Sequence, residues 1–119
     1  MKTLTLMLAT AGLLAVTACS KQPKACFKVE VQNKEGKWVK SSTGLVGELF
    51  YFSSICSENA HATGTTFEYG DGTKGTDESH EYKKPGSYTV KCTVVGAKGN
   101  LSDVATQSVV VKDLQAEAR

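Results

Sequence analysis

The sequence predicts an all-β protein, an antiparallel β-sandwich of about seven short strands. Apolar and polar side chains alternate in several short runs, and turn residues interrupt these runs at short intervals. No run has the apolar period of a long helix. Because alternation with a period of two turns one face of each strand toward a core, such runs are typical of two facing sheets.

The stretch 67–88 predicts a strand, a tight turn, a strand and a second turn. Phe67 and Tyr69 share one strand face, and Gly70-Asp71-Gly72 supplies the residues that a primed hairpin turn needs. Pro85-Gly86 then reverses the chain into a strand whose inward face is expected to hold Tyr88, Val90, Cys92 and Val94.

Other strands are expected before and after this stretch. Ser41 to Gly44 is interpreted as a flexible link, and Phe50, Phe52, Ser54 and Cys56 are expected on one face of a long second strand. The expected strands lie at 27–31, 38–39, 48–56, 65–69, 76–82 and 88–95, with a last one ending at 108–111.

Three linked motifs resemble the PKD domain, an immunoglobulin-like module. The family's Trp-Asp-Phe-Gly-Asp-Gly corresponds to 67–72, with Phe67 in place of Trp, and the later motifs correspond to 80–82 and 85–90. The resemblance covers 26–112 and implies an immunoglobulin-like sandwich of the PKD type that acts as a binding or spacer module, not an enzyme. The motif residues, expected to be structural, are Phe67, Tyr69, Gly70, Asp71, Gly72, His80, Tyr82, Pro85, Gly86 and Tyr88.

The first residues predict a secretory signal. Lys2 precedes an uncharged, mostly apolar run that ends before Ser20. An uncleaved transmembrane helix is the alternative, but a span needs about 20 apolar residues and this run is shorter. Val16-Thr17-Ala18-Cys19 resembles the bacterial lipobox, which implies that 1–18 is removed and that Cys19 is lipidated. Ser20, directly after Cys19, resembles the residue that directs proteobacterial lipoproteins to the outer membrane.

The sequence therefore predicts four regions: a lipoprotein signal peptide at 1–18, a tether at 19–25, the sandwich at 26–112 and a tail at 113–119. The protein is expected to be bound to the membrane through its N-terminal lipid and to lie in the bacterial cell envelope, at the outer membrane. The formal net charge of +2 falls to +1 when Lys2 is removed, and so small a charge argues against binding to nucleic acid.

Four cysteines are present, and lipidation would leave three. A Cys26–Cys56 disulfide is expected, because consecutive antiparallel strands place the start of the first near the end of the second. The alternative, Cys56 to Cys92, suits strand parity, but relative to the immunoglobulin positions the two residues are offset by about 10 Å along the strands. Cys92 is then expected to be a free, buried thiol.

Asp71, Asp77 and Glu78 flank turns and are the candidate calcium ligands, with hydrogen bonding to turn backbone or exposure to solvent as the alternative. No residue pair has zinc-site spacing, and no serine elbow is present. We therefore expect neither a cofactor nor catalysis.

Trp38 is the candidate binding residue. It could be an exposed platform for a sugar ring or a protein partner, or it could pack over Leu49, Tyr51 or Ile55. Three functions remain open: a module that binds protein or carbohydrate or presents a larger partner, an envelope inhibitor or assembly subunit with one dedicated protein partner, and a small calcium-binding envelope protein.

Overall fold

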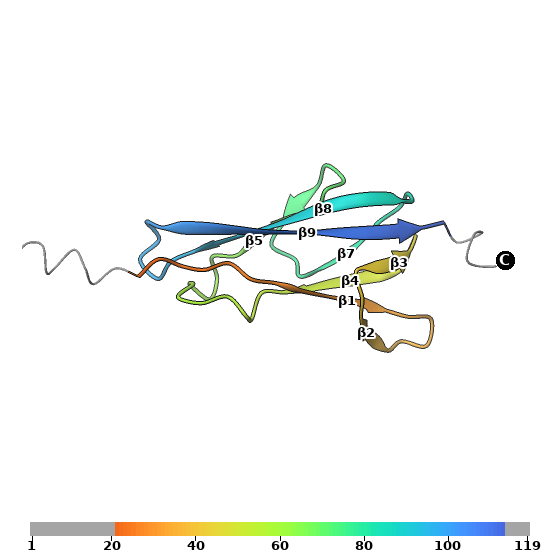
Figure 1. The fold of residues 1–119 in the computed structure, drawn as a ribbon, viewed down its shortest axis with the longest axis horizontal. Helices are drawn as coiled ribbons and strands as arrows, with labels where there is room; N and C mark the ends of the chain where they lie inside the picture. Colours follow the sequence, from red (N-terminus) through yellow and green to blue (C-terminus); the bar gives the residue numbers. More distant parts are fainter. Residues whose placement is uncertain (1–20, 114–119) are drawn as a thin grey trace, which may run out of the picture.

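The computed structural model describes residues 21–113, so the predicted signal peptide and Cys19 lie outside the described residues. Two sheets face each other and form a β-sandwich (Figure 1). The all-β prediction is confirmed. The described part of the chain contains no helix with the length and hydropathy needed to cross a lipid bilayer.

The first sheet has four strands in the order β2-β1-β4-β7, and every neighbouring pair is antiparallel. Its strands are β1 (Lys28–Gln32), β2 (Trp38–Lys40), β4 (Leu49–Ser53) and β7 (Ser79–Glu81). The predicted Trp38 arm is thus a strand at the edge of this sheet. The predicted second long strand is shorter than expected, because it ends at Ser53 and a turn closed by Ser57 N–H and the Ser54 carbonyl follows.

The second sheet has five strands in the order β3-β9-β8-β5-β6. Its strands are β3 (Thr43–Leu45), β5 (Thr66–Glu68), β6 (Lys74–Gly75), β8 (Gly86–Val95) and β9 (Ser102–Lys112). The expected flexible link at 41–44 is wrong in its second half, since β3 pairs in parallel with the end of β9. All other pairs in this sheet are antiparallel.

The core lies between the sheets and follows the predicted alternation. Phe50 and Phe52 of β4 are fully buried, as are alternate residues in the second half of β8 and one residue of β9. Aromatic rings fill its centre; Phe27, for example, packs edge-on against Phe52 at 6.1 Å between ring centroids. The fully buried residues of β8 and β9 are Val90, Cys92, Val94 and Val109.

The signature loop differs from the predicted tight turn. Gly70 and Gly72 have positive φ values of 90° and 92°, as expected of glycines in a turn. However, β5 and β6 pair through Glu68 and Lys74, so the hairpin loop holds five residues, 69–73, and not two. After β6 the chain crosses to the other sheet, where it forms β7.

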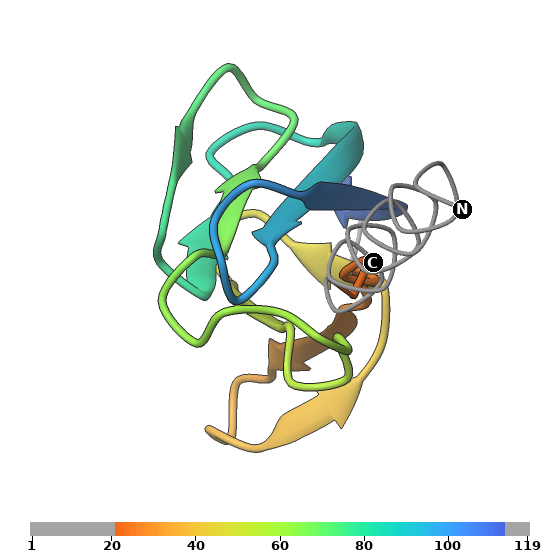
Figure 2. The same ribbon diagram turned by 90° about the vertical axis from the view of Figure 1, so that its left-hand side faces the viewer.

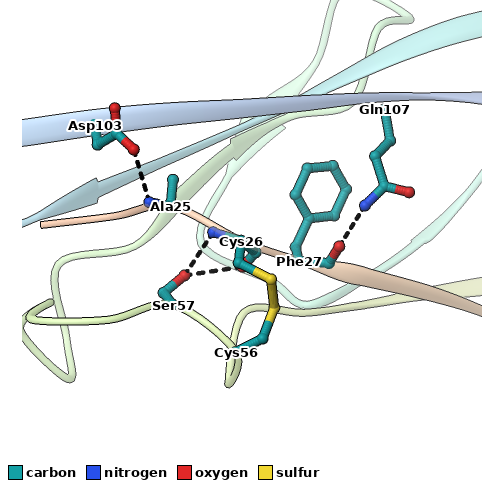
Figure 3. The surroundings of a disulfide bond; sticks show 7 residues. All are labelled: Ala25, Cys26, Phe27, Cys56, Ser57, Asp103 and Gln107. Carbon is teal, nitrogen blue, oxygen red and sulfur yellow. Dashed lines mark hydrogen bonds between the residues drawn. A yellow bond between two sulfur atoms is a disulfide. The ribbon is translucent and has the colours of Figure 1, made fainter.

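Residues 22–25 of the predicted tether are docked on the sandwich and are not a free linker. Lys24 and Glu58 exchange two backbone hydrogen bonds of 2.9 Å each. Ala25 N–H donates to Asp103 Oδ2 at 2.8 Å, and Gln107 donates to the Phe27 carbonyl (Figure 3). Sequence reasoning missed this docking because the partners lie up to 80 residues away.

The Cys26–Cys56 disulfide is present, with 5.4 Å between the Cα atoms. Ser57 reinforces it, because its hydroxyl accepts from Cys26 N–H and donates to the Cys26 carbonyl (Figure 3). Cys92 is a free thiol in the core. In the end-on view, the 57–64 loop and the β8–β9 turn lie at the end of the sandwich where residue 21 enters (Figure 2).

Candidate functional site

Two clusters carry the residues that the sequence singled out. The first, the signature cluster, joins Tyr69 and Asp71 of the 69–73 loop to His80 of β7. The His80 ring lies parallel to the Tyr69 ring, with 4.0 Å between centroids and 3° between planes. His80 Nε2 lies 2.7 Å from Asp71 Oδ2. Because β7 belongs to the first sheet and the loop extends from the second, this cluster ties the two sheets together.

Asp71 is held by a second set of hydrogen bonds. Its Oδ1 accepts from the Thr73 hydroxyl at 2.5 Å and from Thr73 N–H at 3.1 Å. Partial burial raises the pKa of Asp71, but the hydrogen bonds from Thr73 and His80 outweigh it and hold the pKa below its ordinary value. The carboxylate therefore organises its own loop, which is the structural role implied by the resemblance.

Two further tyrosines complete the signature cluster. The buried Tyr82 donates its hydroxyl proton to the Tyr69 carbonyl at 2.7 Å, and its ring stacks on Tyr88 at 4.4 Å. Tyr88 donates to the Lys84 carbonyl at 2.6 Å, so its hydroxyl bonds backbone at the bend before β8. An open hollow of about 460 Å³ lies beside these rings and is lined by Asp71, Thr73, His80, Glu81, Lys83, Lys84 and Tyr88.

The three calcium candidates are not brought together. Asp71 faces Thr73 and His80, while Glu78 accepts a hydrogen bond from the Tyr51 hydroxyl at 3.3 Å. The backbone carbonyl of Asp77 accepts a hydrogen bond from the Tyr69 hydroxyl at 2.5 Å. Among residues 21–113 no group of three or more His, Cys, Asp or Glu side chains is placed to hold a metal ion. For Asp71 the structure shows the alternative that the sequence left open, a carboxylate that accepts a hydrogen bond from turn backbone at Thr73 N–H.

The second cluster is an exposed aromatic pair, Trp38 of β2 and Tyr51 of β4. Trp38 is 44% exposed, and its ring lies 5.7 Å from the Tyr51 ring at an interplanar angle of 56°. Both sequence-based interpretations of Trp38 therefore hold in part, because the indole packs on Tyr51 and still presents much of its surface to solvent. Ile55 is 88% exposed.

The register explains why the two rings meet. Trp38 lies opposite Gln32, and Tyr51 lies opposite Glu30. Gln32 and Glu30 point to the same side of β1, away from the core that Val31 enters. The rings thus lie on the outer face of the first sheet, on either side of β1, and we call this surface the Trp38 face. Its other members are the apolar Leu49 and the polar residues Lys28, Glu30, Gln32, Lys40, Ser53, Ser79 and Glu81.

Tyr51 is the site residue that sequence reasoning placed only as a packing partner of Trp38. The signal was available, since strand parity puts Tyr51 on the face opposite Phe50 and Phe52. What parity cannot give is the strand order, and β1 has to lie between β2 and β4 before the two rings can meet.

Comparison with known families identifies the module, because the profile of the PKD domain matches residues 38–111. The chain belongs to the PKD domain family. The family assignment implied by the three motifs is thus confirmed, as is the sandwich.

Relatives of this PKD domain occur in larger proteins. Collagenase ColA of Bacillus cereus is 35% identical over 77 residues, which are 61% of this chain and 8% of the collagenase. The chain therefore spans only a small part of that relative.

Solved structures with the same fold include a chain from work on the promiscuous specificity of carbohydrate-binding modules of the β-sandwich super family. It aligns with a TM-score of 0.64 and 25% identity, over 80% of this chain and 36% of that one. The PKD1 domain of the Vibrio cholerae metalloprotease PrtV aligns with a TM-score of 0.55 and 23% identity, over 77% of this chain and 99% of that one. The PKD1 domain of Vibrio anguillarum Epp aligns with a TM-score of 0.55 and 20% identity, over 79% of this chain and 98% of that one.

Proposed function

We propose that this chain is a non-enzymatic, lipid-anchored protein of the bacterial cell envelope whose PKD domain binds carbohydrate through the Trp38 face. The observation that carries the proposal is the half-exposed indole of Trp38 beside Tyr51 on a sheet face whose other residues, apart from Leu49, are polar. An envelope protein fits the family, since relatives of this domain occur in bacterial proteins such as a collagenase and a metalloprotease.

Aromatic rings suit a sugar ligand for a physical reason. The face of a pyranose ring carries C–H groups, which pack on an aromatic surface, while its edge carries hydroxyls that need hydrogen-bond partners. Trp38 and Tyr51 offer the surface, and Glu30, Gln32 and Lys40 on the same face offer the partners. The similarity to part of a chain studied for its carbohydrate-binding modules, at 25% identity over 80% of this chain and 36% of that one, is consistent with a glycan ligand.

Anchoring rests on the lipobox-like Val16-Thr17-Ala18-Cys19. Each buried methylene of an acyl chain adds about 0.8 kcal/mol of membrane affinity, so two or more chains hold a protein durably at a membrane. The domain would then present the Trp38 face to glycans of the envelope, with the outer membrane as the proposed location.

The test is retention of the detergent-extracted lipoprotein on insoluble peptidoglycan and on immobilised polysaccharides. Trp38→Ala and Tyr51→Ala should each weaken retention about tenfold, which corresponds to about 1.4 kcal/mol. Trp38→Phe should keep most of it, because a ring remains.

Ile55→Ala is the matched control, since Ile55 is an exposed apolar residue outside the Trp38 face. Equal losses for Ile55→Ala and Trp38→Ala would show nonspecific adhesion. If all variants bound as the natural chain does, the Trp38 face would not be the binding surface. Cross-linking in intact cells that gave one dominant protein partner would favour an assembly subunit or an inhibitor instead.

A further inference from the structure

The docked segment 22–25 leaves very little chain between the proposed lipid and the folded domain. Pro23 is fully buried, and Lys24 is fixed by its two backbone hydrogen bonds to Glu58. Gln22 Nε2 donates to the Ser102 carbonyl at 3.0 Å, and the Gln22 carbonyl accepts from Asn59 at 3.4 Å. The folded part of the molecule therefore begins at Gln22.

Only Ser20 and Lys21 separate Gln22 from Cys19. A fully extended chain advances at most about 3.6 Å per residue, so Gln22 cannot lie more than about 11 Å from Cys19. A lipid on Cys19 would hold that residue at the headgroup layer. The partners of Gln22, namely Ser102 and Asn59, must then lie close to the same layer.

These partners belong to one end of the sandwich, formed by the 57–64 loop and the 96–101 turn, which we call the proximal end. The loop and the turn are joined, since His61 N–H donates to the Val95 carbonyl at 2.7 Å and Ala60 forms a bridge with Gly96. The exposed side chains of Lys24 and Lys98 lie at this end and can approach lipid phosphates. The opposite end carries the C-terminal end of β9 (Figure 1).

We propose that the proximal end rests on the phospholipid headgroup layer and so fixes the orientation of the whole domain. This inference rests on the lipid anchor proposed above. The strands then run roughly along the membrane normal, and the two outer sheet faces are directed parallel to the membrane plane. Trp38 lies opposite Gln32 of β1, which follows Cys26 by six residues, so Trp38 stands about 20 Å further from the bilayer than Cys26 does.

This orientation has a functional consequence for glycan binding. A face that pointed at the bilayer could admit only a chain end, whereas the Trp38 face would lie open sideways, where an extended polysaccharide can pass along it. The short docked leader would therefore act as a positioning device and not as a flexible leash.

The experiment uses tryptophan fluorescence in the full mature lipoprotein, reconstituted in vesicles that contain a headgroup-labelled nitroxide phospholipid, a short-range quencher. The chain has one tryptophan, so Trp38 reports its own distance. In a second protein, Trp38→Phe is combined with Ala97→Trp, which moves the probe to the exposed tip of the 96–101 turn. Lys98→Trp in the same background is a second proximal probe, in case Ala97→Trp disturbs the turn.

We expect the proximal probes to be quenched several-fold more strongly than Trp38. Insertion of about twelve Gly and Ser residues between Ser20 and Lys21 should abolish that difference, because a flexible chain of this length reaches on the order of 20 Å. Comparable quenching of Trp38 and the proximal probes, or quenching that survives the insertion, would overturn the inference.

Vesicle flotation separates the two proposals. If the protein floats with the vesicles and no probe is quenched, the anchor stands and the orientation is wrong. If the protein does not float, the proposed lipid anchor is wrong, and so is the proposed orientation, which depends on it.

Discussion

His80 stacks on Tyr69 and at the same time contacts the Asp71 carboxylate, so a single imidazole from the first sheet closes the signature loop of the second. Imidazole and carboxylate would suit acid–base chemistry, yet here His80 Nε2 and both carboxylate oxygens of Asp71 are engaged within the fold. The His80–Asp71 pair of this PKD domain therefore links the two sheets.

The Asp71→Asn variant should lose stability at neutral pH. The amide cannot reproduce the charged hydrogen bonds to Thr73 and His80, and because the carboxylate is partly exposed we expect a loss of about 1 kcal/mol. The pKa of Asp71 is lower in the folded state, so its contribution is present above the ordinary value of 3.8 and is lost as the pH falls through the folded value.

Urea unfolding of both proteins between pH 7 and pH 2.5 measures this effect. The stability difference should be constant down to about pH 4 and should shrink below it. A difference that persisted unchanged at pH 2.5 would mean that the Asp71 charge is not its source.

Tyr82→Phe should destabilise the domain more than Tyr88→Phe does. The Tyr82 hydroxyl is buried and satisfies the Tyr69 carbonyl, so its removal leaves a buried acceptor unpaired at a cost of about 1 to 2 kcal/mol. Thermal unfolding should show a Tm lowered by roughly 5 to 10 °C. Tyr88→Phe, whose hydroxyl bonds the Lys84 carbonyl at an exposed bend, is the matched control, and an equal effect of the two variants would contradict this account.

The inward faces of the strands could be predicted from the sequence, and the pairing that joins distant segments could not. Alternation alone assigns Phe50, Phe52 and Val90 to the core, because one face of a half-buried strand must be apolar. Nothing local marks Thr43–Leu45 as a strand. Within this strand, position 44 requires glycine, since a Cβ there would lie 2.8 Å from the Phe50 ring.

The candidate site follows the same division. The sequence pointed to Trp38 because a lone tryptophan on a polar arm is unusual, but the Tyr51 partner depends on the strand order of the sheet. The three calcium candidates are not brought together, because carboxylates that are close in sequence lie where the chain crosses between the sheets, and Asp71 and Glu78 there find different partners.

Cys92 should be inert toward thiol reagents in the folded protein. Burial raises the pKa of its thiol to about 11, and the side chain is inaccessible. A disulfide reagent at pH 8 should therefore react only as fast as the domain opens, and the rate should rise steeply with urea.

Because the folded pKa of Cys92 lies above the ordinary 9.0, its thiol should also cost stability as the pH rises from about 9 toward 11. Cys92→Val should remove that alkaline loss, and rapid labelling without denaturant would contradict the buried position.

Removal of the Cys26–Cys56 disulfide should weaken both the fold and the docking of its leader. The bond closes a loop with a sequence separation of 30, for which chain entropy predicts about 3 to 4 kcal/mol. The Cys26→Ala/Cys56→Ala double variant should lower the Tm by on the order of 15 °C. Hydrogen exchange rates should increase most at the amides of Lys24, Ala25 and Glu58, because the disulfide holds the segment that these amides fix to the sandwich.

Ser57→Ala, which keeps the disulfide and removes only the hydroxyl contacts of Ser57, is the control and should cost about 1 kcal/mol. If exchange at these amides did not change in the double variant, the leader would be held by its hydrogen bonds alone, and the disulfide would have no part in orienting the domain.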